Sequence, residues 1–249
     1  MKIPILFKLG NIFFKRAYFI YFPLYRIYKN VSDKREVRLI KKYIEIDSNV
    51  VDIGANIGFY TRLFSKKVGE NGKVYAFEPS PENYERLRQN TIDLKNVFIR
   101  KAAVGNTNSK LRLYVSNDLN VDHRTYPTKE MRRSVEVDCI RLDAFFQENK
   151  KIDFIKLDVQ GFEYQAILGM QEIIEENKEL KMMIEFWPSG LYEAGSDPQN
   201  LIELLKRCGF HLYMISKNGL IKFSNEQTFK DNEMYYTIFA MRDLINEIV

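Results

Sequence analysis

The chain has 249 residues, of which 45% are apolar and 29% are charged, and its net charge is +5. This length fits one large α/β domain and leaves no room for a second full catalytic domain. The positive charge is modest and no concentrated basic tract is present, which argues against a nucleic-acid-binding protein. Cys139 and Cys208 show neither C-x-x-C nor zinc-ligand spacing, so a reduced, cytoplasmic protein is expected.

The first 32 residues are aromatic and basic, and they contain no acidic residue. Lys8, Lys15 and Arg16 interrupt the apolar runs, so a transmembrane span is not expected, and no cleavage site typical of a signal peptide follows. Two interpretations stay open for residues 1–32. They form helices that pack on the domain and cap its ligand, or they make a peripheral contact with the inner membrane face. Residues 33–249 are expected to form the main domain.

From residue 33 onward, helical and strand patterns alternate along the sequence. Such alternation predicts a parallel sheet with helices between its strands. In the first half of the chain, the patterns predict helices at about residues 33–46, 57–68 and 81–94, and strands at about 49–54, 73–78 and 97–101.

The alternation breaks at about residues 108–141, where two strand-like runs flank a polar loop. We interpret this region as a β insertion on the sheet. The last two predicted strands are expected to pair antiparallel, which completes a doubly wound, Rossmann-like α/β fold. In the second half, the patterns predict helices at about residues 142–148, 162–177 and 197–208, and strands at 151–158, 181–186, 210–215 and 234–241.

Residues 49–61 are the most informative segment, since they combine a buried strand, a glycine turn and a helix start. Gly54 and Gly58 allow a sharp turn and a close approach to a ligand, because they lack a Cβ. The spacing with Asp52, D-x-G-x-x-x-G, differs from the G-x-G-x-x-G of dinucleotide sites and disfavours an NAD-dependent enzyme. It resembles motif I of class I S-adenosylmethionine methyltransferases.

A second carboxylate, Glu78, ends the next predicted strand, and Pro79 then turns the chain out of that strand. In a βαβ unit this strand end lies beside the ribose of a bound nucleotide, where a carboxylate can accept hydrogen bonds from both hydroxyls. Asp158 and Glu185 end later strands in the same way. Several carboxylates at one edge of the sheet favour a ligand that carries an amine or a ribose.

Four segments in register resemble the FkbM family of S-adenosylmethionine-dependent methyltransferases. They read VDIGANIGFYT at 51–61, AFEPS at 76–80, LD at 142–143 and IKLDVQGFE at 155–163, with LG following at 168–169. The resemblance runs from about residue 45 to 240. It implies a class I methyltransferase fold and O-methylation of a sugar, glycan or small-molecule hydroxyl. The family often has Glu where Gln160 stands and Ala where Phe162 stands, so no base role is assigned to Gln160.

The resemblance also implies where the cofactor S-adenosylmethionine would bind. The turn after Asp52 would hold its methionine end, Glu78 its ribose, and the turn at residues 101–102 its adenine. Asp158 would lie near the transferred methyl group, the alternative being a cap on the helix that follows. The implied cofactor set is Asp52, Gly54, Ala55, Asn56, Gly58, Glu78, Pro79, Lys101, Ala102 and Asp158.

The acceptor side is predicted from polar loops. His123 in the insertion is the candidate catalytic base, and together with Asp158 it forms the predicted catalytic set. Arg124 is a candidate anchor for a carboxylate or phosphate of the acceptor. The alternative is a surface loop held by local ion pairs. Trp187 and Tyr192 would stack on a sugar or apolar acceptor. The predicted acceptor set is Arg124, Tyr126, Glu185, Trp187 and Tyr192.

Two other functions stay open at this stage. The protein could be a non-catalytic S-adenosylmethionine-binding scaffold or membrane-associated regulator, which intact Asp52 and Glu78 would not distinguish from an enzyme. A nucleic-acid methyltransferase is disfavoured, because neither an N-P-P-Y motif nor a cysteine at a strand end is present. No metal is expected, although Asp158 and other acids could hold a divalent ion.

Overall fold

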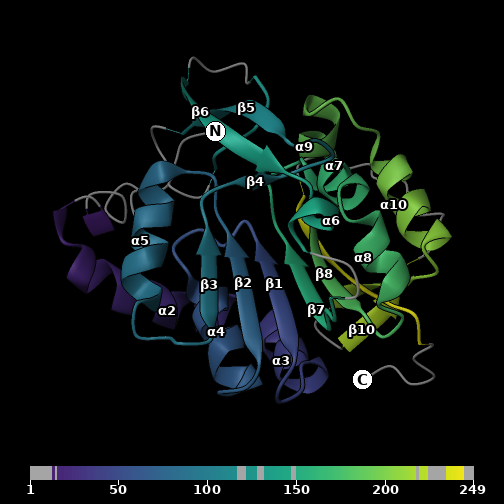
Figure 1. Ribbon diagram of the computed structural model, residues 1–249, viewed down its shortest axis with the longest axis horizontal. Coiled ribbons are helices and arrows are strands. Elements are labelled where there is room, and N and C mark those ends of the chain that lie inside the picture. The colour runs from purple at the N-terminus through teal and green to yellow at the C-terminus, as the bar shows by residue number, and fades with distance from the viewer. Residues whose placement is uncertain are drawn as a thin grey trace.

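In the computed structural model, the described residues are 13–14, 16–116, 122–127, 132–146, 150–216, 219–223 and 234–243. Their main feature is an eight-stranded sheet with the order β10-β9-β11-β8-β7-β1-β2-β3 (Figure 1). Its parallel half comprises β3 (Val97–Arg100), β2 (Lys73–Phe77), β1 (Asn49–Ile53), β7 (Phe154–Leu157) and β8 (Lys181–Phe186).

The other edge of the sheet is antiparallel. There β11 (Tyr236–Met241) lies between β8 and β9 (His211–Ser216) and runs antiparallel to both. The predicted antiparallel pairing of the last two strands is therefore confirmed. The edge strand β10 (Gly219–Lys222), which pairs with β9, was not predicted.

Helices cover both faces of the sheet (Figure 1). The α3, α4 and α5 helices (Lys34–Tyr43, Phe59–Val68 and Pro81–Thr91) pack on one face. The α6, α7, α8 and α10 helices (Leu142–Phe145, Glu163–Leu168, Gln171–Glu176 and Pro198–Arg207) pack on the other. Two further helices flank this core, namely α2 (Tyr18–Ser32) and α9 (Pro188–Glu193).

The predicted β insertion is present as a separate small sheet with the order β4-β6-β5. Its strands are β4 (Ala103–Val104), β5 (Ser109–Val115) and β6 (Arg133–Ile140), of which β4 was not predicted. Figure 1 shows this sheet beyond the arrowheads of β1, β2 and β3, where the parallel strands end. The insertion therefore covers the edge of the main sheet at which α/β proteins bind ligands.

Two predicted elements differ from the structure. The single helix expected at 162–177 is two helices, α7 and α8, separated by Gly169 and Met170. A Cβ on Gly169 would lie 1.9 Å from the Gly105 carbonyl oxygen, so the chain bends where two backbones touch. The loop expected after β8 begins with the short helix α9, with Pro188 at its first position.

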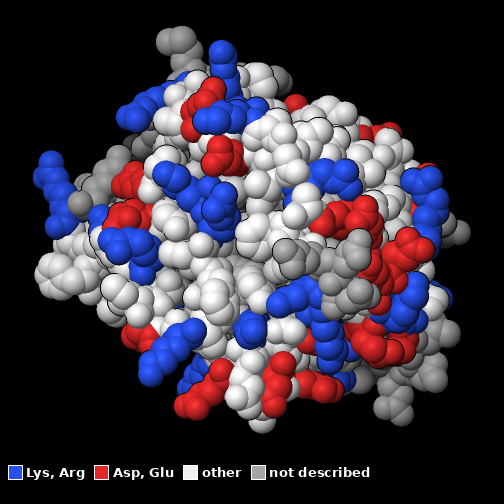
Figure 2. Space-filling view, viewed as in Figure 1, with Lys and Arg blue, Asp and Glu red and all other residues white. Residues whose placement is uncertain are grey.

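The described helices and the face shown in Figure 2 can be compared with what a membrane-spanning or strongly charged protein requires. No helix among the described residues is both long and apolar enough to cross a bilayer. On the face shown in Figure 2, acidic and basic side chains are interspersed, and neither sign forms a continuous patch.

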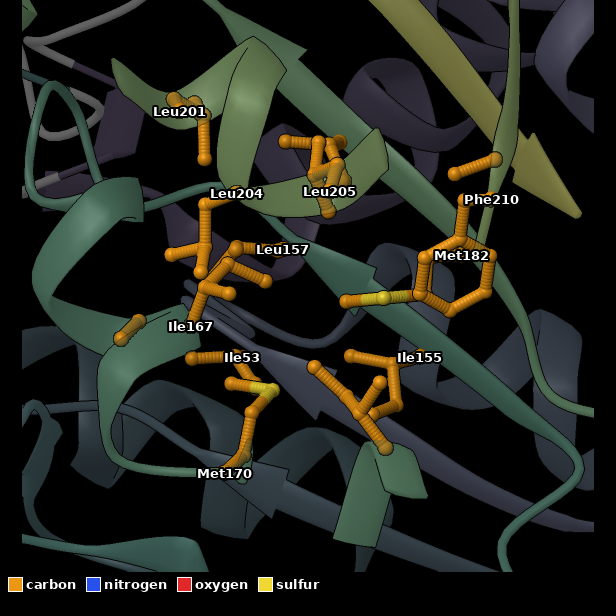
Figure 3. Close-up of a cluster of buried hydrophobic side chains, with 14 of the residues drawn as sticks. Ile53, Ile155, Leu157, Ile167, Met170, Met182, Leu201, Leu204, Leu205 and Phe210 are labelled. Atoms are coloured by element: carbon orange, nitrogen blue, oxygen red, sulfur yellow. The ribbon is translucent and has the colours of Figure 1, made fainter. Parts of the chain in front are cut away.

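The core follows from the alternation of strand side chains. Val51 and Ile53 of β1 face α7 and α10, whereas Val50 faces α3 and α4. Figure 3 shows the first of these layers, in which Leu204 of α10 and Ile167 of α7 meet the strands. Val50 and Asp52 are two residues apart in β1, so their side chains point to the same face of the sheet. The Asp52 carboxylate therefore points toward α4 and away from this layer.

Candidate active site

The carboxyl ends of β1, β2, β7 and β8 border a cavity of about 880 Å³. Residues of the small sheet, the β8–α9 turn and helix α2 complete its lining, with Leu113, Trp187 and Tyr25 as examples. This volume lies in the usual range for a small-molecule site and suffices for a nucleoside and part of a second ligand.

The glycine turn after β1 forms one wall of this cavity. Gly54 has φ of 76°, and a Cβ at this position would lie 1.8 Å from the carbonyl oxygen of Asp158. The turn therefore requires glycine, because β1 and β7 end in direct backbone contact here. Gly54 N–H and Ala55 N–H both donate to the Phe77 carbonyl at 3.0 Å, which fixes the turn against β2.

Glu78 lies beside this turn, buried and on the cavity wall. Its Oε2 accepts the Asn56 N–H at 2.8 Å, and its Oε1 accepts the Ser80 N–H at 2.9 Å. Burial raises the pKa of Glu78 to about 7, against the lowering effect of these two hydrogen bonds. The carboxylate is thus held rigidly at the end of β2 with lone pairs available for a ligand.

Asp52 is fully buried and is not among the described residues that line the cavity. Its Oδ2 accepts a 2.6 Å hydrogen bond from Thr61 in α4, and its Oδ1 has no partner within the described part of the chain. Burial raises the pKa of Asp52, although the nearby Lys156 charge opposes this. As placed, Asp52 lies behind the cavity wall, where its hydrogen bond to Thr61 connects the end of β1 to α4.

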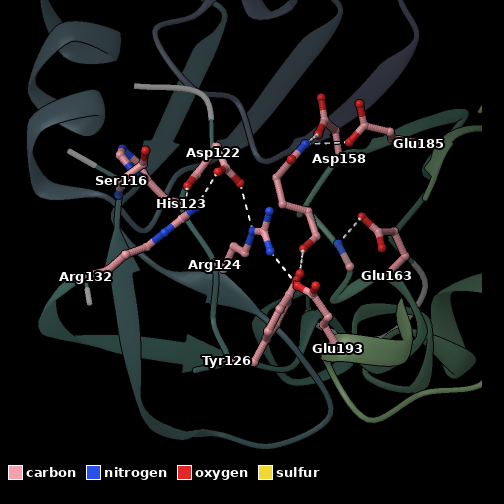
Figure 4. A network of polar contacts seen from close by, with 12 residues as sticks. Ser116, Asp122, His123, Arg124, Tyr126, Arg132, Asp158, Glu163, Glu185 and Glu193 are labelled. Atoms are coloured by element: carbon pink, nitrogen blue, oxygen red, sulfur yellow. Dashed lines mark hydrogen bonds and ion pairs between the residues drawn. The ribbon is translucent and has the colours of Figure 1, made fainter. Parts of the chain in front are cut away.

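A cluster of four polar side chains occupies the ends of β7 and β8. Lys156 Nζ donates to Asp158 Oδ2 at 3.0 Å, and Gln160 Nε2 donates to Asp158 Oδ1 at 3.0 Å and to Glu185 Oε2. Glu185 and Asp158 also share a hydrogen bond. All four side chains line the cavity, and Figure 4 shows the two carboxylates side by side.

The pKa values of the two carboxyl groups in this cluster are shifted in opposite directions. Burial alone would raise the pKa of Asp158, but the Lys156 ammonium and three hydrogen bonds hold it below its ordinary value of 3.8. Burial and the charge of Asp158 raise the pKa of Glu185 well above its ordinary value. Of the two, Asp158 is therefore the carboxyl group that ionises more readily, and Glu185 is the one that holds a proton more readily.

The turn after Asp158 is held in an unusual conformation. Gln160 has φ of 55°, which is uncommon for a residue with a Cβ. The Tyr126 hydroxyl donates to the Gln160 carbonyl at 2.9 Å, and Glu163 Oε1 accepts the N–H groups of Val159 and Gly161 (Figure 4). Tyr126 thus acts from behind the cavity wall, where it positions the turn.

Glu163 provides a prediction about stability. Burial raises the pKa of Glu163 from 4.5 to about 7, so between these pH values the folded chain binds a proton that the unfolded chain does not. The free energy of unfolding therefore falls as pH rises from 4.5 to 7. At pH 8, Glu163→Gln should be more stable than the wild type by roughly 1–2 kcal/mol, and its stability should depend less on pH.

Denaturant unfolding at several pH values measures this effect. The exposed Glu82→Gln, in the first turn of α5, is the matched control and should change the pH slope little. A Glu163→Gln variant less stable than the wild type at pH 8 would contradict the assigned protonation.

The insertion contributes a network of ion pairs. Arg124 donates to Asp122 Oδ1 at 2.8 Å and to Glu193 Oε2, and Arg132 donates to Asp122 Oδ2 at 2.6 Å (Figure 4). The Arg124 guanidinium also lies 4.6 Å from the centre of the Trp187 ring. Arg124 lines the cavity, but its charge is already balanced by two carboxylates.

His123 lines the same cavity, and its hydrogen bonding shows which ring nitrogen is available to a ligand. Burial lowers the pKa of His123 to about 4, so the ring is neutral. Its Nδ1 accepts the Ser116 N–H at 3.2 Å, which places the ring proton on Nε2. In this arrangement His123 presents a hydrogen-bond donor to the cavity.

The remaining predicted residues divide between the cavity and its surroundings. Trp187 lies on the cavity wall and stacks on Tyr235, with ring centres 5.0 Å apart. Tyr192 is exposed and lies outside the described cavity lining. Predicted residues in the lining are Gly54, Ala55, Asn56, Glu78, Pro79, Ala102, His123, Arg124, Asp158, Glu185 and Trp187. Those not found among the described lining residues are Asp52, Gly58, Lys101, Tyr126 and Tyr192.

Several lining residues were not predicted, and Lys156 is the most important of them. A lysine in the middle of the apolar strand β7 was a usable signal, because a buried lysine requires an acidic partner. Tyr60 places its ring 4.9 Å from the Lys156 Nζ. Tyr25, Tyr28 and Tyr235 have no comparable sequence signal, since aromatic residues are frequent throughout this chain.

Residues 52–212 match a family model described as the methyltransferase FkbM domain. The chain belongs to this family. It is 26% identical to 2-O-methyltransferase NoeI of Sinorhizobium fredii, with 64% of the chain and 71% of that protein covered. It is 24% identical to hexuronic acid methyltransferase AglP of Haloferax volcanii, with 73% and 71% covered.

A solved structure agrees on the fold. A Clostridium thermocellum protein described as an rRNA-methylase gives a TM-score of 0.50 at 14% identity, with 84% of this chain and 93% of that chain covered. The predicted class I methyltransferase fold and FkbM membership are both confirmed. The protein is a methyltransferase, and S-adenosylmethionine is its cofactor.

The residues present fit this cofactor. The Gly54 turn leaves space that a Cβ would fill, and the buried Glu78 carboxylate faces the cavity beside it. We propose that Glu78 accepts hydrogen bonds from both ribose hydroxyls and that the methionine end lies near the Gly54 turn. Among the described residues, no group of three His, Cys, Asp or Glu side chains is arranged to hold a metal ion.

The Glu78 assignment predicts a pH-dependent affinity. An ionised carboxylate is the better acceptor, and Glu78 has a pKa of about 7. The dissociation constant for S-adenosylmethionine should therefore rise as pH falls below 7. Glu78→Gln should bind roughly tenfold more weakly at pH 8, about 1.4 kcal/mol, and show a flat pH profile. Calorimetric titration between about pH 6 and 8 tests both expectations. Unchanged affinity in the variant would contradict the role of Glu78 in cofactor binding.

Proposed function

We propose that this protein transfers the methyl group of S-adenosylmethionine to a hydroxyl of a sugar or sugar-acid acceptor. The observation that carries the proposal is the cluster of Lys156, Asp158, Gln160 and Glu185 on the cavity wall. It places two carboxyl groups, of which Asp158 ionises more readily than Glu185, next to the glycine turn of the cofactor site.

In the proposed reaction, Asp158 accepts a hydrogen bond from the acceptor hydroxyl and orients its oxygen toward the methyl carbon. S-Adenosylmethionine supplies an electrophilic methyl group on a sulfonium. As the oxygen–carbon bond forms and the carbon–sulfur bond breaks, the hydroxyl proton passes to Asp158 and then to solvent. Lys156 keeps Asp158 ionised before transfer, and such positioning and proton acceptance can together account for large rate effects.

Two further observations support a sugar-like acceptor. Tyr235 stacks on Trp187 at the cavity wall and is itself exposed, and such aromatic surfaces bind the C–H faces of sugar rings. The relatives named a 2-O-methyltransferase and a hexuronic acid methyltransferase make the same class of acceptor the first choice here. We infer that His123 Nε2–H and Arg124 contribute polar contacts to the acceptor.

Incubation with radiolabelled S-adenosylmethionine and a panel of neutral and uronic-acid oligosaccharides tests the proposal. We expect label in the oligosaccharide, in a product that survives mild alkali, as a methyl ether does. An alkali-labile product would show a methyl ester on the acid group and would overturn hydroxyl transfer. Label found in RNA in place of sugar would favour a nucleic-acid methyltransferase.

A further inference from the structure

Helix α2 exposes a continuous apolar stripe. Its members recur at the i, i+4, i+7, i+8 and i+11 positions that share one face of a helix. All of them are exposed, and none of the residues of α2 is buried. The stripe consists of Ile20, Leu24, Ile27, Tyr28 and Val31.

The opposite face of α2 is held against the protein. The Tyr18 hydroxyl accepts a 2.6 Å hydrogen bond from Asn90 in α5, and the Tyr25 ring packs edge-on against Phe59 in α4. Lys29 forms an ion pair with Asp33. The helix is therefore fixed in an orientation that leaves its apolar stripe facing outward.

The charge of the chain is concentrated in the same segment. Residues 1–32 contain six basic residues and no acidic one, a charge of +6, whereas the whole chain carries +5. The other 217 residues therefore carry a net charge of −1. The six are Lys2, Lys8, Lys15, Arg16, Arg26 and Lys29.

We propose that α2 docks on an anionic lipid surface. An apolar helix face combined with cations and no carboxylates matches the chemistry of interfacial helices. The positive charge favours anionic headgroups. A second copy of the chain is a poorer occupant, because two segments of +6 would face each other across the interface.

The docking face adjoins the catalytic cavity. Tyr28 belongs to the stripe and also lines the cavity, together with its neighbours Tyr25 and Lys29. A membrane in contact with the stripe would lie next to this wall. Resting on the proposed function, we infer that the acceptor is a sugar displayed at that surface, as in a lipid-linked glycan.

Vesicle co-sedimentation of the full chain, without cofactor or acceptor, tests the docking step independently of catalysis. We expect binding to vesicles with about one third phosphatidylglycerol, and roughly tenfold weaker binding to phosphatidylcholine alone or in about 0.5 M NaCl. Leu24→Gln/Ile27→Gln should lower binding to the anionic vesicles by roughly tenfold or more. Transfer to a soluble acceptor should stay unchanged.

A matched control removes equally exposed apolar side chains elsewhere. Leu24 and Ile27 are 57% and 64% exposed, and Ile46 and Ile92 are 73% and 78% exposed. Ile46→Gln/Ile92→Gln should bind vesicles as the wild type does. Equal binding by both double variants would overturn the proposal. So would an absence of vesicle binding, whether the face is then covered by residues 1–12 or by a second copy, which light scattering detects.

Discussion

Replacing Asp158 by Asn should lower kcat for methyl transfer by roughly 100- to 1000-fold, the range typical of a lost general base. The amide keeps the size of the side chain but cannot take the hydroxyl proton. The dissociation constant for S-adenosylmethionine should stay within about fivefold of the wild type, less than 1 kcal/mol. Single-turnover rates at saturating cofactor, combined with calorimetry, separate the two effects.

Glu185→Gln is the matched control for this experiment, since it lies in the same cluster and shares hydrogen bonds with Asp158 and Gln160. Because burial and the charge of Asp158 raise the pKa of Glu185, a neutral amide at this position changes the electrostatics less than an amide at Asp158 does. We expect less than about a tenfold loss of kcat. If Glu185→Gln were the more damaging of the two, or if Asp158→Asn lost cofactor affinity with kcat intact, Asp158 would not be the base.

Replacing Gly54 by Ala should abolish detectable cofactor binding and destabilise the fold by roughly 3 kcal/mol or more. The added Cβ would lie 1.8 Å from the Asp158 carbonyl oxygen, and backbone on both sides cannot move aside cheaply. The left-handed φ of 76° adds strain to this clash. Thermal unfolding and calorimetric titration measure the two effects.

Gly195 offers a control that separates strain from contact. It has nearly the same conformation, with φ of 79°, but no heavy atom within 4 Å of an added Cβ. Gly195→Ala should therefore cost only about 1 kcal/mol and leave cofactor binding unchanged. If the two substitutions changed stability and cofactor binding equally, the close contact between β1 and β7 would not be the reason that the turn requires glycine.

The sequence was most informative where local chemistry and position along the chain agree. The D-x-G-x-x-x-G turn and Glu78 follow buried strands, and parallel strands bring their carboxyl ends to one edge. Gly54 and Glu78 could therefore be placed in the cavity from sequence. The sequence alone could not show that Asp52 lies behind the turn and outside the cavity lining. Its burial there depends on α4 and on the hydrogen bond with Thr61.

The acceptor side was less predictable, because its residues come together only through tertiary packing. His123 carries the right side chain for a base, but its tautomer is set by the Ser116 N–H on a neighbouring strand end. Tyr126 donates a hydrogen bond to the Gln160 carbonyl, although the two residues are 34 positions apart in the sequence. The break between α7 and α8 depends on Gly105, a residue of the insertion that no local pattern connects to Gly169.

A crystal structure of the full chain with bound S-adenosylhomocysteine tests the central claim most directly. We expect the Glu78 carboxylate on both ribose hydroxyls and the sulfur facing Asp158 across a space large enough for an acceptor hydroxyl. A cofactor bound with its ribose away from Glu78, or with its sulfur shielded from Asp158, would contradict the account of this cavity as a methyl-transfer site.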